Sequence, residues 1–321
     1  MSKEKTASRD LVLGIIFLSQ TMIGILGNFS VLYHCLFLYH TQCRIRATHV
    51  ILKHLTIANS LVILSKGVPQ TITAFGLKHF FGDLACKLLL YVQRVGRGVS
   101  LGSTCLLIIF QTIMISPMGS CWKGLKVKAP KYVGFSISLC WVQCMFLSSV
   151  FPAYVLYVSV KWGGRNITKR RDLGYCVTTD HEKITGSVYA ALIVFPEVSF
   201  SVLIIWASGS MVFTLYRHRQ QVRYIHRARV SPRSSAETRA TRSILVLVST
   251  FICFHTLSST FHVAIALLHN QNWLLVNTAA LISLCFSTVS PFLLMNHDPT
   301  VSRLCFLFMR NSVSPNRIRK M

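Results

Sequence analysis

The sequence predicts an all-α membrane protein, a single bundle of seven transmembrane helices. Seven apolar runs are joined by short polar loops that hold most of the charge, and each run is long enough to cross a ~30 Å hydrocarbon core, which takes about 20 helical residues. Hydrophobic residues make up 52% of the 321 and charged residues only 13%, against about 25% charged residues in a soluble domain. Because an ionised group inside a bilayer costs several kcal/mol, this deficit is typical of a membrane protein.

The length of the apolar runs fixes the order of the spans. The first run follows Lys3, Lys5 and Arg9 but is far longer than the apolar core of a signal peptide, and no A-x-A site follows it, so we interpret it as an uncleaved span. We assign residues 1–321 to one seven-transmembrane domain with a short cytoplasmic tail over 297–321. Within this tail, Asp298–Arg310 fits a short amphipathic helix on the inner membrane surface. The predicted spans are 11–39, 47–75, 87–116, 131–159, 184–216, 240–268 and 273–296.

The distribution of basic residues predicts an extracellular amino terminus and a cytoplasmic carboxyl terminus. Seven spans put the termini on opposite sides, and this orientation gives the inner segments nearly twice as many Lys and Arg residues as the outer ones. Cytoplasmic loops carry such an excess. The sequon Asn166-Ile-Thr falls in an outer loop in the same orientation. We therefore expect a multi-pass protein of the plasma membrane that is glycosylated at Asn166.

Two of the 11 cysteines are placed for an outer disulfide bond. Cys86 begins span three on its outer side, and Cys176 lies in the same outer loop as Asn166. A bond between them would tie the loop across the bundle in a compartment that permits disulfides. The alternative is two free thiols. The other cysteines lie in spans or on the inner side and are interpreted as small apolar residues.

Charges inside the spans are few and therefore informative. Arg94 and Arg97 share a face of span three, and Arg97 lies about 16 Å along the helix from Cys86, near the middle of the bilayer. Glu197 is the only acid well inside a span. Arg97 and Glu197 form either a buried ion pair that holds the bundle together or the floor of a ligand pocket, with an arginine facing an anionic or hydrogen-bonding ligand. The two interpretations are compatible.

Other polar residues in the spans have less specific interpretations. His255, His262 and His269 recur every seven residues on span six, without an acid or cysteine at metal-ligand spacing, so we expect a polar stripe facing the pocket and no metal. Lys53 and Lys66 in span two are expected to snorkel or to pair inside the bundle. The net charge of +25 fits basic loops beside anionic lipid, and no aromatic-interleaved groove suggests nucleic-acid binding.

Several motifs resemble those of known receptors. Gly27-Asn28, Cys86 with a loop cysteine, Trp141 and Pro291 resemble the rhodopsin-like G-protein-coupled receptors. The stretch SPRSSAETRATRSILVLVSTF at 231–251 closely resembles the type-1 vomeronasal receptors, which carry a Ser-Pro…Glu-x-Arg-Ala-Thr-x-x-Ile-Leu pattern there. The resemblance covers essentially the whole chain. Further motifs of the same family, in the same order, are RVGRGVS (94–100), CLLIIFQTIMISP (105–117), NIT…YC (166–176) and RHRQQV (217–222).

The chain departs from the general receptor pattern at its switch positions. Gln111 stands where the Asp-Arg-Tyr arginine is usual, and Asn59 replaces the span-two aspartate, the main anionic ligand of a sodium site. The span-seven Asn-Pro-x-x-Tyr begins here with Ser290-Pro291. These departures, which the vomeronasal subgroup usually shows, leave the standard activation switch without its residues. Pro196-Glu197 is a local departure, since that subgroup more often has an arginine followed by an acid.

The resemblance implies a chemosensory receptor for a small pheromone-like ligand, coupled to an inhibitory-class heterotrimeric G-protein. The ligand pocket would lie among spans three, five, six and seven, where we nominate Arg94, Arg97, Glu197 and His262. Opening between spans five and six would expose the basic inner face to the G-protein, and the same face attracts anionic lipid. The residues expected to face the G-protein are Gln111, Arg217, Arg219, Arg239 and Arg242.

A transporter or channel for a small solute is the main alternative. Such a protein would show internal repeats and broken helices in matched halves, and seven spans do not divide evenly. We do not expect an enzyme, because no paired acids, HExxH motif or Ser/His arrangement lies in the spans. No cofactor is expected, and span seven has no lysine to hold retinal.

Overall fold

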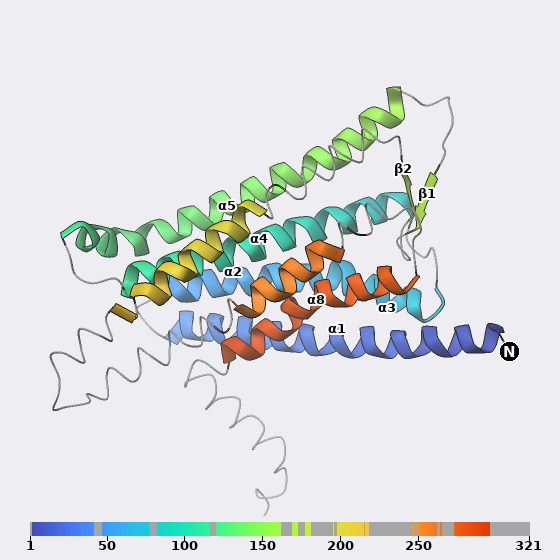
Figure 1. Ribbon diagram of the computed structural model, residues 1–321, viewed down its shortest axis with the longest axis horizontal. Coiled ribbons are helices and arrows are strands. Elements are labelled where there is room, and N and C mark those ends of the chain that lie inside the picture. Colours follow the sequence, from blue (N-terminus) through green and yellow to red (C-terminus); the bar gives the residue numbers. More distant parts are fainter. Residues whose placement is uncertain are drawn as a thin grey trace, which may run out of the picture.

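Helices occupy all seven predicted spans in the part of the chain that the structure, a computed structural model, describes (Figure 1). Five of them are long and apolar enough to cross a membrane, and the described part of span five, Val198–Thr214, is a shorter apolar helix. The structure describes residues 2–41, 47–77, 82–115, 120–161, 169–172, 177–180, 195, 198–214, 216–217, 246, 249–261, 264 and 273–295.

The seven-helix class predicted from the apolar runs is confirmed, and the spans agree with the observed helices to within a few residues at most ends. Residues 198–214 and 249–261 form the described helical parts of spans five and six. The predicted amphipathic helix Asp298–Arg310 lies outside the described residues. The other helices are α1 (Ser2–Thr41), α2 (Ala47–Val62), η1 (Ile63–Gly67), α3 (Val68–Ala74), α4 (Asp83–Ile115), α5 (Ser120–Lys161) and α8 (Trp273–Met295).

Span two is not one continuous α-helix. The π-helical turn η1 joins α2 to α3, and its wider bond runs from the Val68 amide to the Ile63 carbonyl. Pro69, in the first turn of α3, has no amide hydrogen to donate to the carbonyl four residues earlier, and its ring crowds that carbonyl. The backbone therefore accommodates one extra residue in a single π-turn, a feature often found at functional sites.

Two other departures concern the ends of spans. α1 begins at Ser2, well before the predicted edge at 11, and α5 begins at Ser120 where the apolar run suggested 131. Helices extend past the hydrocarbon core because polar residues there are solvated and still satisfy their backbone groups within the helix. The segment between α5 and span five contains a two-stranded antiparallel sheet of β1 (Lys169–Asp172) and β2 (Val177–Asp180), in which Lys169 faces Asp180 in the register.

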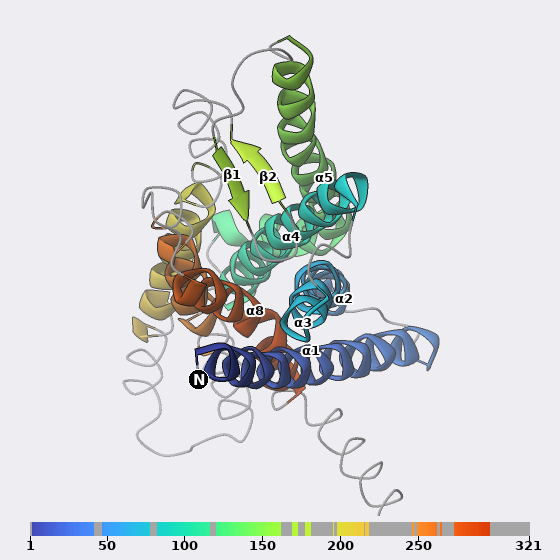
Figure 2. The same ribbon diagram turned by 90° about the vertical axis from the view of Figure 1, so that its right-hand side faces the viewer.

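α4 is the central helix among the described spans. It packs against both α2 and α5, and α1 packs against α2, α3 and α8; the end-on view shows α2 between α1 and α4 (Figure 2). The window of α4 that would cross the membrane is 56% buried, whereas that of α5 is only 17% buried. The outer face of α5 carries exposed aromatic residues such as Phe135 and Phe146, which suits contact with lipid.

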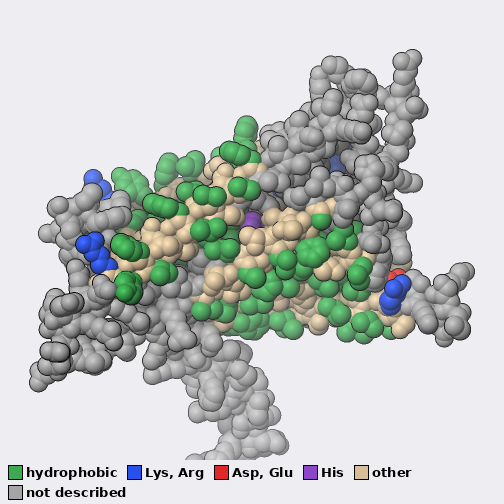
Figure 3. All heavy atoms as spheres, in the orientation of Figure 1, with side chains coloured by type: hydrophobic (Ala, Val, Ile, Leu, Met, Phe, Trp, Pro, Cys, Tyr) green, Lys and Arg blue, Asp and Glu red, His purple; other side chains and the backbone are tan. Residues whose placement is uncertain are grey.

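The exterior has the polarity pattern of a membrane protein. Hydrophobic side chains cover the middle of the molecule, whereas the visible Lys and Arg side chains lie mainly at its two ends (Figure 3). Lys128 and Lys131, which lie in the amino-terminal part of α5, are both exposed. This pattern is expected when charged groups leave the hydrocarbon region for the lipid headgroups and water.

The α2–α4 contact depends on a glycine. A Cβ atom at Gly96 would lie 3.0 Å from the Ala58 carbonyl oxygen and 3.1 Å from Val62 Cγ2. Small residues at such crossings let helix backbones approach closely, which is how helices associate in lipid. The approach matters here because α2 and α4 carry the polar residues of the bundle interior.

We expect Gly96→Val to destabilise the bundle by about 1–3 kcal/mol, because the new side chain would push α2 from α4. Thermal unfolding of the purified protein measures the loss. Gly134→Val on α5 is the matched control, since a Cβ there meets no atom of the described residues within 4 Å. Equal losses of stability in the two variants would contradict the close-approach role of Gly96.

Candidate ligand site

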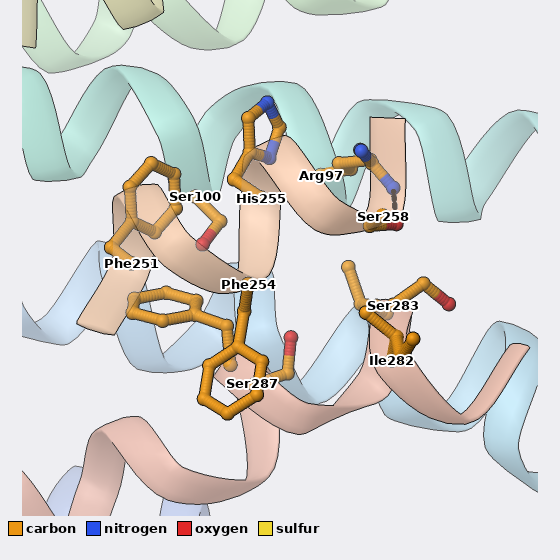
Figure 4. Close-up of a pocket in the computed structure, with 11 residues that line it drawn as sticks. Arg97, Ser100, Phe251, Phe254, His255, Ser258, Ile282, Ser283 and Ser287 are labelled. Carbon is orange, nitrogen blue, oxygen red and sulfur yellow. Dashed lines mark hydrogen bonds between the residues drawn. The ribbon is translucent and has the colours of Figure 1, made fainter. Parts of the chain in front are cut away.

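A small cavity lies between spans two, three, six and seven (Figure 4). Its volume is about 30 Å³, room for one water molecule or a monatomic ion. Hydroxyl groups and aromatic rings share the wall with one basic side chain, Arg97. The lining residues are Val62, Arg97, Ser100, Phe251, Phe254, His255, Ser258, Ile282, Ser283, Phe286 and Ser287.

Arg97 joins span three to span six across this cavity. Its Nη1 donates to Ser258 Oγ at 2.9 Å, and its Nη2 donates to Ser259 Oγ at 3.1 Å. Figure 4 shows the first of these bonds at the edge of the cavity. Hydrogen bonds from a charged donor are worth about 1.5–3 kcal/mol. They are also directional, so the guanidinium holds the two helices at this level.

Asn59 joins spans two, three and seven at the next level of the bundle. Its Oδ1 accepts from Ser100 Oγ at 2.8 Å and from Ser287 Oγ at 3.4 Å. Its Nδ2 donates to Ser290 Oγ at 2.7 Å. Asn59 and Ser290 are fully buried. Ser100 and Ser287 also line the cavity, so the asparagine cluster begins where the cavity ends.

Asn28 extends the polar contacts to span one. Its Nδ2 donates to the carbonyl oxygens of Gly24 and Ser287, both at 2.8 Å. The neighbouring Gly27 permits this approach, because a Cβ there would lie 3.1 Å from Pro291 Cγ. The Gly-Asn pair and the proline, both singled out in the sequence, therefore meet at the α1–α8 contact.

Aromatic residues close the cavity on the side of span six. Phe251 packs edge-on against Phe286 with centroids 4.4 Å apart, and it stacks on His255 at 5.2 Å. Aromatic pairs of this geometry contribute about 0.5–1.5 kcal/mol beyond their burial. The wall therefore combines a rigid apolar part with the hydroxyl groups opposite.

Lys66 is a second basic residue in this region. It lies in the π-turn η1 and is only 5% exposed, so it is enclosed by the bundle and does not reach the lipid headgroups. A basic residue inside a span is costly, and such residues usually face the interior of the bundle.

The structure places some of the nominated residues and not others. Arg97 lines the cavity, and Arg94 is half-buried one turn away on α4. Gln111 is half-buried near the carboxyl end of α4, and Arg217 is exposed at the end of span five. Cys86 takes part in a disulfide bond. The remaining nominated residues lie outside the described residues, so the Cys86–Cys176 pairing and their roles stay predictions: Glu197, His262, Asn166, Cys176, Arg219, Arg239 and Arg242.

Sequence reasoning missed the serine residues of the cavity. Ser258 and Ser259 form an adjacent pair on span six, one helical turn beyond His255. A hydroxyl-rich face on an otherwise apolar span was the available signal. His255, from the predicted histidine stripe, does line the cavity. Among the described residues, no three His, Cys, Asp or Glu side chains lie close enough together to hold a metal ion.

The arrangement of helices is that of the rhodopsin-type seven-helix bundle. The structure superimposes on the crystal structure of squid rhodopsin with a TM-score of 0.70 and 15% sequence identity, over 97% of this chain and 89% of the rhodopsin chain. At this identity the similarity concerns the fold alone.

Sequence comparison gives the family. Residues 11–307 match the model of the vomeronasal organ pheromone receptor family. Human vomeronasal type-1 receptor 4 is 53% identical over 95% of this chain and its own whole length, and human vomeronasal type-1 receptor 2 is 52% identical over 92% of this chain and 74% of that protein. The rat vomeronasal type-1 receptor 90 is 31% identical over 90% of this chain and 91% of its own.

The chain therefore belongs to the vomeronasal organ pheromone receptor family, the type-1 vomeronasal receptors. It is a multi-pass membrane protein of the G-protein-coupled receptor class and not an enzyme. The resemblance inferred from the motif at 231–251 is confirmed. The alternative of a transporter or channel is not favoured.

Loss of the Asn59 side chain should leave buried hydroxyl groups without partners. We expect Asn59→Leu to destabilise the protein by about 2–4 kcal/mol, since each unsatisfied buried group costs about 1–3 kcal/mol. Thermal unfolding in detergent checks this. Ser138→Ala is the control, because Ser138 is exposed and bonds to Gly134 of its own helix. A stability loss no greater than that of the control would show that Asn59 does not join the spans.

Proposed function

We propose that the protein is a chemosensory receptor that binds a small external ligand within the helix bundle and activates an inhibitory-class heterotrimeric G-protein. The observation that carries this proposal is the position of Arg97. It lies inside the bundle, lines a cavity and bonds to two serines of span six. The guanidinium of an arginine placed in this way is already ordered, so it can give up a hydrogen bond to the protein and form one to a ligand. This loses less conformational entropy than ordering a mobile side chain.

The ligand acts by changing the contacts of span six. A ligand group that accepts from Arg97 competes with the hydroxyls of Ser258 and Ser259. The bundle state in which span six has moved outward then binds ligand more tightly, so its population rises. Gln111 stands at the inner end of α4 without the usual arginine, and the contact between spans three and six at Arg97 takes over the restraining role.

The preferred ligand is largely apolar and carries one polar group. Phe251, Phe254 and Phe286 supply apolar wall, while Arg97 and the serines supply a small number of fixed polar contacts, as in most small-molecule sites. The cavity of about 30 Å³ is too small for an odorant-sized molecule. Binding therefore requires the helices to separate, and this couples occupancy to conformation. Arg94, Glu197 and His262 would complete the enlarged site.

The proposed orientation of the chain in the membrane gives roles to its outer loop and its inner face. The whole chain, residues 1–321, acts as one receptor domain in the plasma membrane with its amino terminus outside and its tail from 297 in the cytoplasm. A Cys86–Cys176 bond ties down the outer loop. At the inner face Gln111, Arg217 and the basic residues up to Arg242 meet the G-protein, next to anionic lipid. The excess of Lys and Arg in these inner segments supports this orientation.

Ligand-dependent nucleotide exchange on a purified inhibitory-class G-protein tests the proposal. We expect Arg97→Ala to lower ligand potency at least about tenfold, the equivalent of one charged hydrogen bond. Glu197→Gln should also lose response at normal surface expression if Glu197 contacts ligand, whereas its intracellular retention would indicate a purely structural ion pair. Gln143→Ala, exposed on α5, is the control. If the protein carried a solute across the membrane and no ligand caused nucleotide exchange, the receptor assignment would be wrong.

The orientation has a separate test. We expect Asn166→Gln to remove an N-linked glycan, seen as faster migration that equals that of the wild-type protein after glycosidase treatment. An antibody against an added amino-terminal tag should stain intact cells. If the tag is reached only after permeabilisation, and Asn166 carries no glycan, then the topology is the reverse of the one proposed.

A further inference from the structure

Gln143 is an exposed amide on a helix that is long and apolar enough to cross the membrane. Every other Asn or Gln side chain that is described within a span is buried or half-buried. Within the described part of the chain, the Gln143 amide makes no hydrogen bond. Because lipid tails offer no donor or acceptor, an amide left in the hydrocarbon is costly. Gln143 therefore needs a polar partner from outside the chain.

Contacts on the buried side of α5 fix the rotation of this helix. Trp141 Nε1 donates to His54 Nδ1 at 3.2 Å. Cys144 fills the space over a glycine of α4, since a Cβ at Gly98 would lie 2.9 Å from the Cys144 Sγ atom. These contacts hold one side of α5 against α2 and α4, so Gln143 cannot turn into the bundle.

Gln143 also lies deep in the membrane. It follows Lys131, an exposed basic residue of α5, by about 18 Å at ~1.5 Å per residue. Its neighbour Cys144 packs against Gly98, which directly follows Arg97, the residue placed near the middle of the bilayer. A glutamine side chain at this depth is too short to reach the lipid headgroups, so its partner must also lie within the membrane.

Gln143 belongs to a stripe of exposed side chains along α5. Tyr132, Leu139 and Phe146 recur every seven residues, and each is more than half exposed. Gln143 lies four residues after Leu139 and three before Phe146, which puts it on the same face of the helix. A seven-residue repeat suits the left-handed crossing of about 20° that most helix pairs in membranes adopt. We refer to Tyr132, Leu139, Gln143 and Phe146 as the α5 stripe.

A second copy of the chain offers a partner of the required geometry. All copies are inserted in the same direction, so a two-fold axis along the membrane normal brings each residue to the depth of its counterpart. A glutamine amide both donates and accepts, so two of them can bond to each other. One polar residue in an apolar seam sets the register and oligomeric state of paired helices. Lipid can cover the apolar residues of the stripe, but only a polar partner satisfies its amide.

We propose that the α5 stripe is a dimerisation face, on which Gln143 bonds to Gln143 of the partner subunit. The membrane-crossing window of α5 is only 17% buried, the lowest share of the five such windows in the described residues, so the helix has surface free for this contact. No residue of the stripe lines the cavity, and the proposal therefore does not rest on the proposed receptor function.

Energy transfer between differently labelled copies of the full-length protein in lipid vesicles tests the proposal. The dissociation constant is measured by varying the ratio of protein to lipid. We expect Gln143→Leu to raise this constant at least about fivefold, and Gln143→Asn, which keeps an amide, to leave it near the wild-type value. Equal thermal unfolding of the wild type and Gln143→Leu in detergent shows that the fold is intact.

A pair of phenylalanine variants controls for the loss of a lipid-facing side chain. Phe146→Ala, within the α5 stripe, should also weaken association. Phe29→Ala makes the same change at an exposed position of α1 and should leave the dissociation constant unchanged.

Mild oxidation of cysteine variants locates the contact. Gln143→Cys and Leu139→Cys should cross-link two copies above the wild-type background, because the two-fold axis places each residue beside its counterpart. Gly134→Cys is the matched control. Gly134 is exposed on α5 but lies about 180° around the helix from Gln143, so it should not cross-link.

The outcomes decide the proposal directly. Association that is weakened in Gln143→Leu and retained in Gln143→Asn supports it. A dissociation constant unchanged in Gln143→Leu overturns it, and so does cross-linking of Gly134→Cys as strong as that of Gln143→Cys. Absence of energy transfer at every ratio of protein to lipid also overturns it, and would assign the amide to a different membrane component.

Discussion

The hydrocarbon core of a bilayer offers no water to polar groups, so every polar side chain inside the spans must find its partner inside the bundle. Asn59 shows how strongly this constraint organises the structure. Its side-chain amide accepts hydrogen bonds from Ser100 on span three and from Ser287 on span seven, and it donates a third bond to Ser290 on span seven. Hydrophobic burial provides little force between helices in lipid, and such bonds together with close packing at glycines decide which helices are neighbours.

The same constraint arranges the polar contacts of the interior in successive levels along the bundle. Arg97 bonds to span six at the cavity, Asn59 joins spans two, three and seven below it, and Asn28 adds span one through the Ser287 carbonyl. Asn59 and Asn28 both bond to Ser287, and Arg97 shares with Ser100 and Ser287 the wall of the cavity. The polar groups of four spans therefore meet at neighbouring positions around the cavity, although Gln111 replaces the usual switch arginine.

The sequence predicted those features that depend on composition and missed those that depend on geometry. Apolar length located the spans, and counting from Cys86 placed Arg97 near the middle of its helix, because helical rise is nearly constant. The serines were not found because a hydroxyl in a span often bonds to its own helix, as Ser60 does with Thr56. Whether a serine instead reaches a neighbouring helix, as Ser258 does for Arg97, depends on rotation about the helix axis. Hydropathy carries no information on that rotation.

The π-turn at Ile63–Gly67 has a consequence for how such receptors diverge. A π-turn contains one residue more than the α-helical turn it replaces, and it absorbs that residue within one turn without rotating the helix beyond it. Loss of a single residue at Ile63–Gly67 would therefore restore a regular α-helix and leave Asn59 and the residues of α3 facing their present neighbours. A duplicated copy of this chain can thus gain or lose one residue at this turn while the rest of the span keeps its packing, which makes the turn a tolerant place for a change of length inside the membrane.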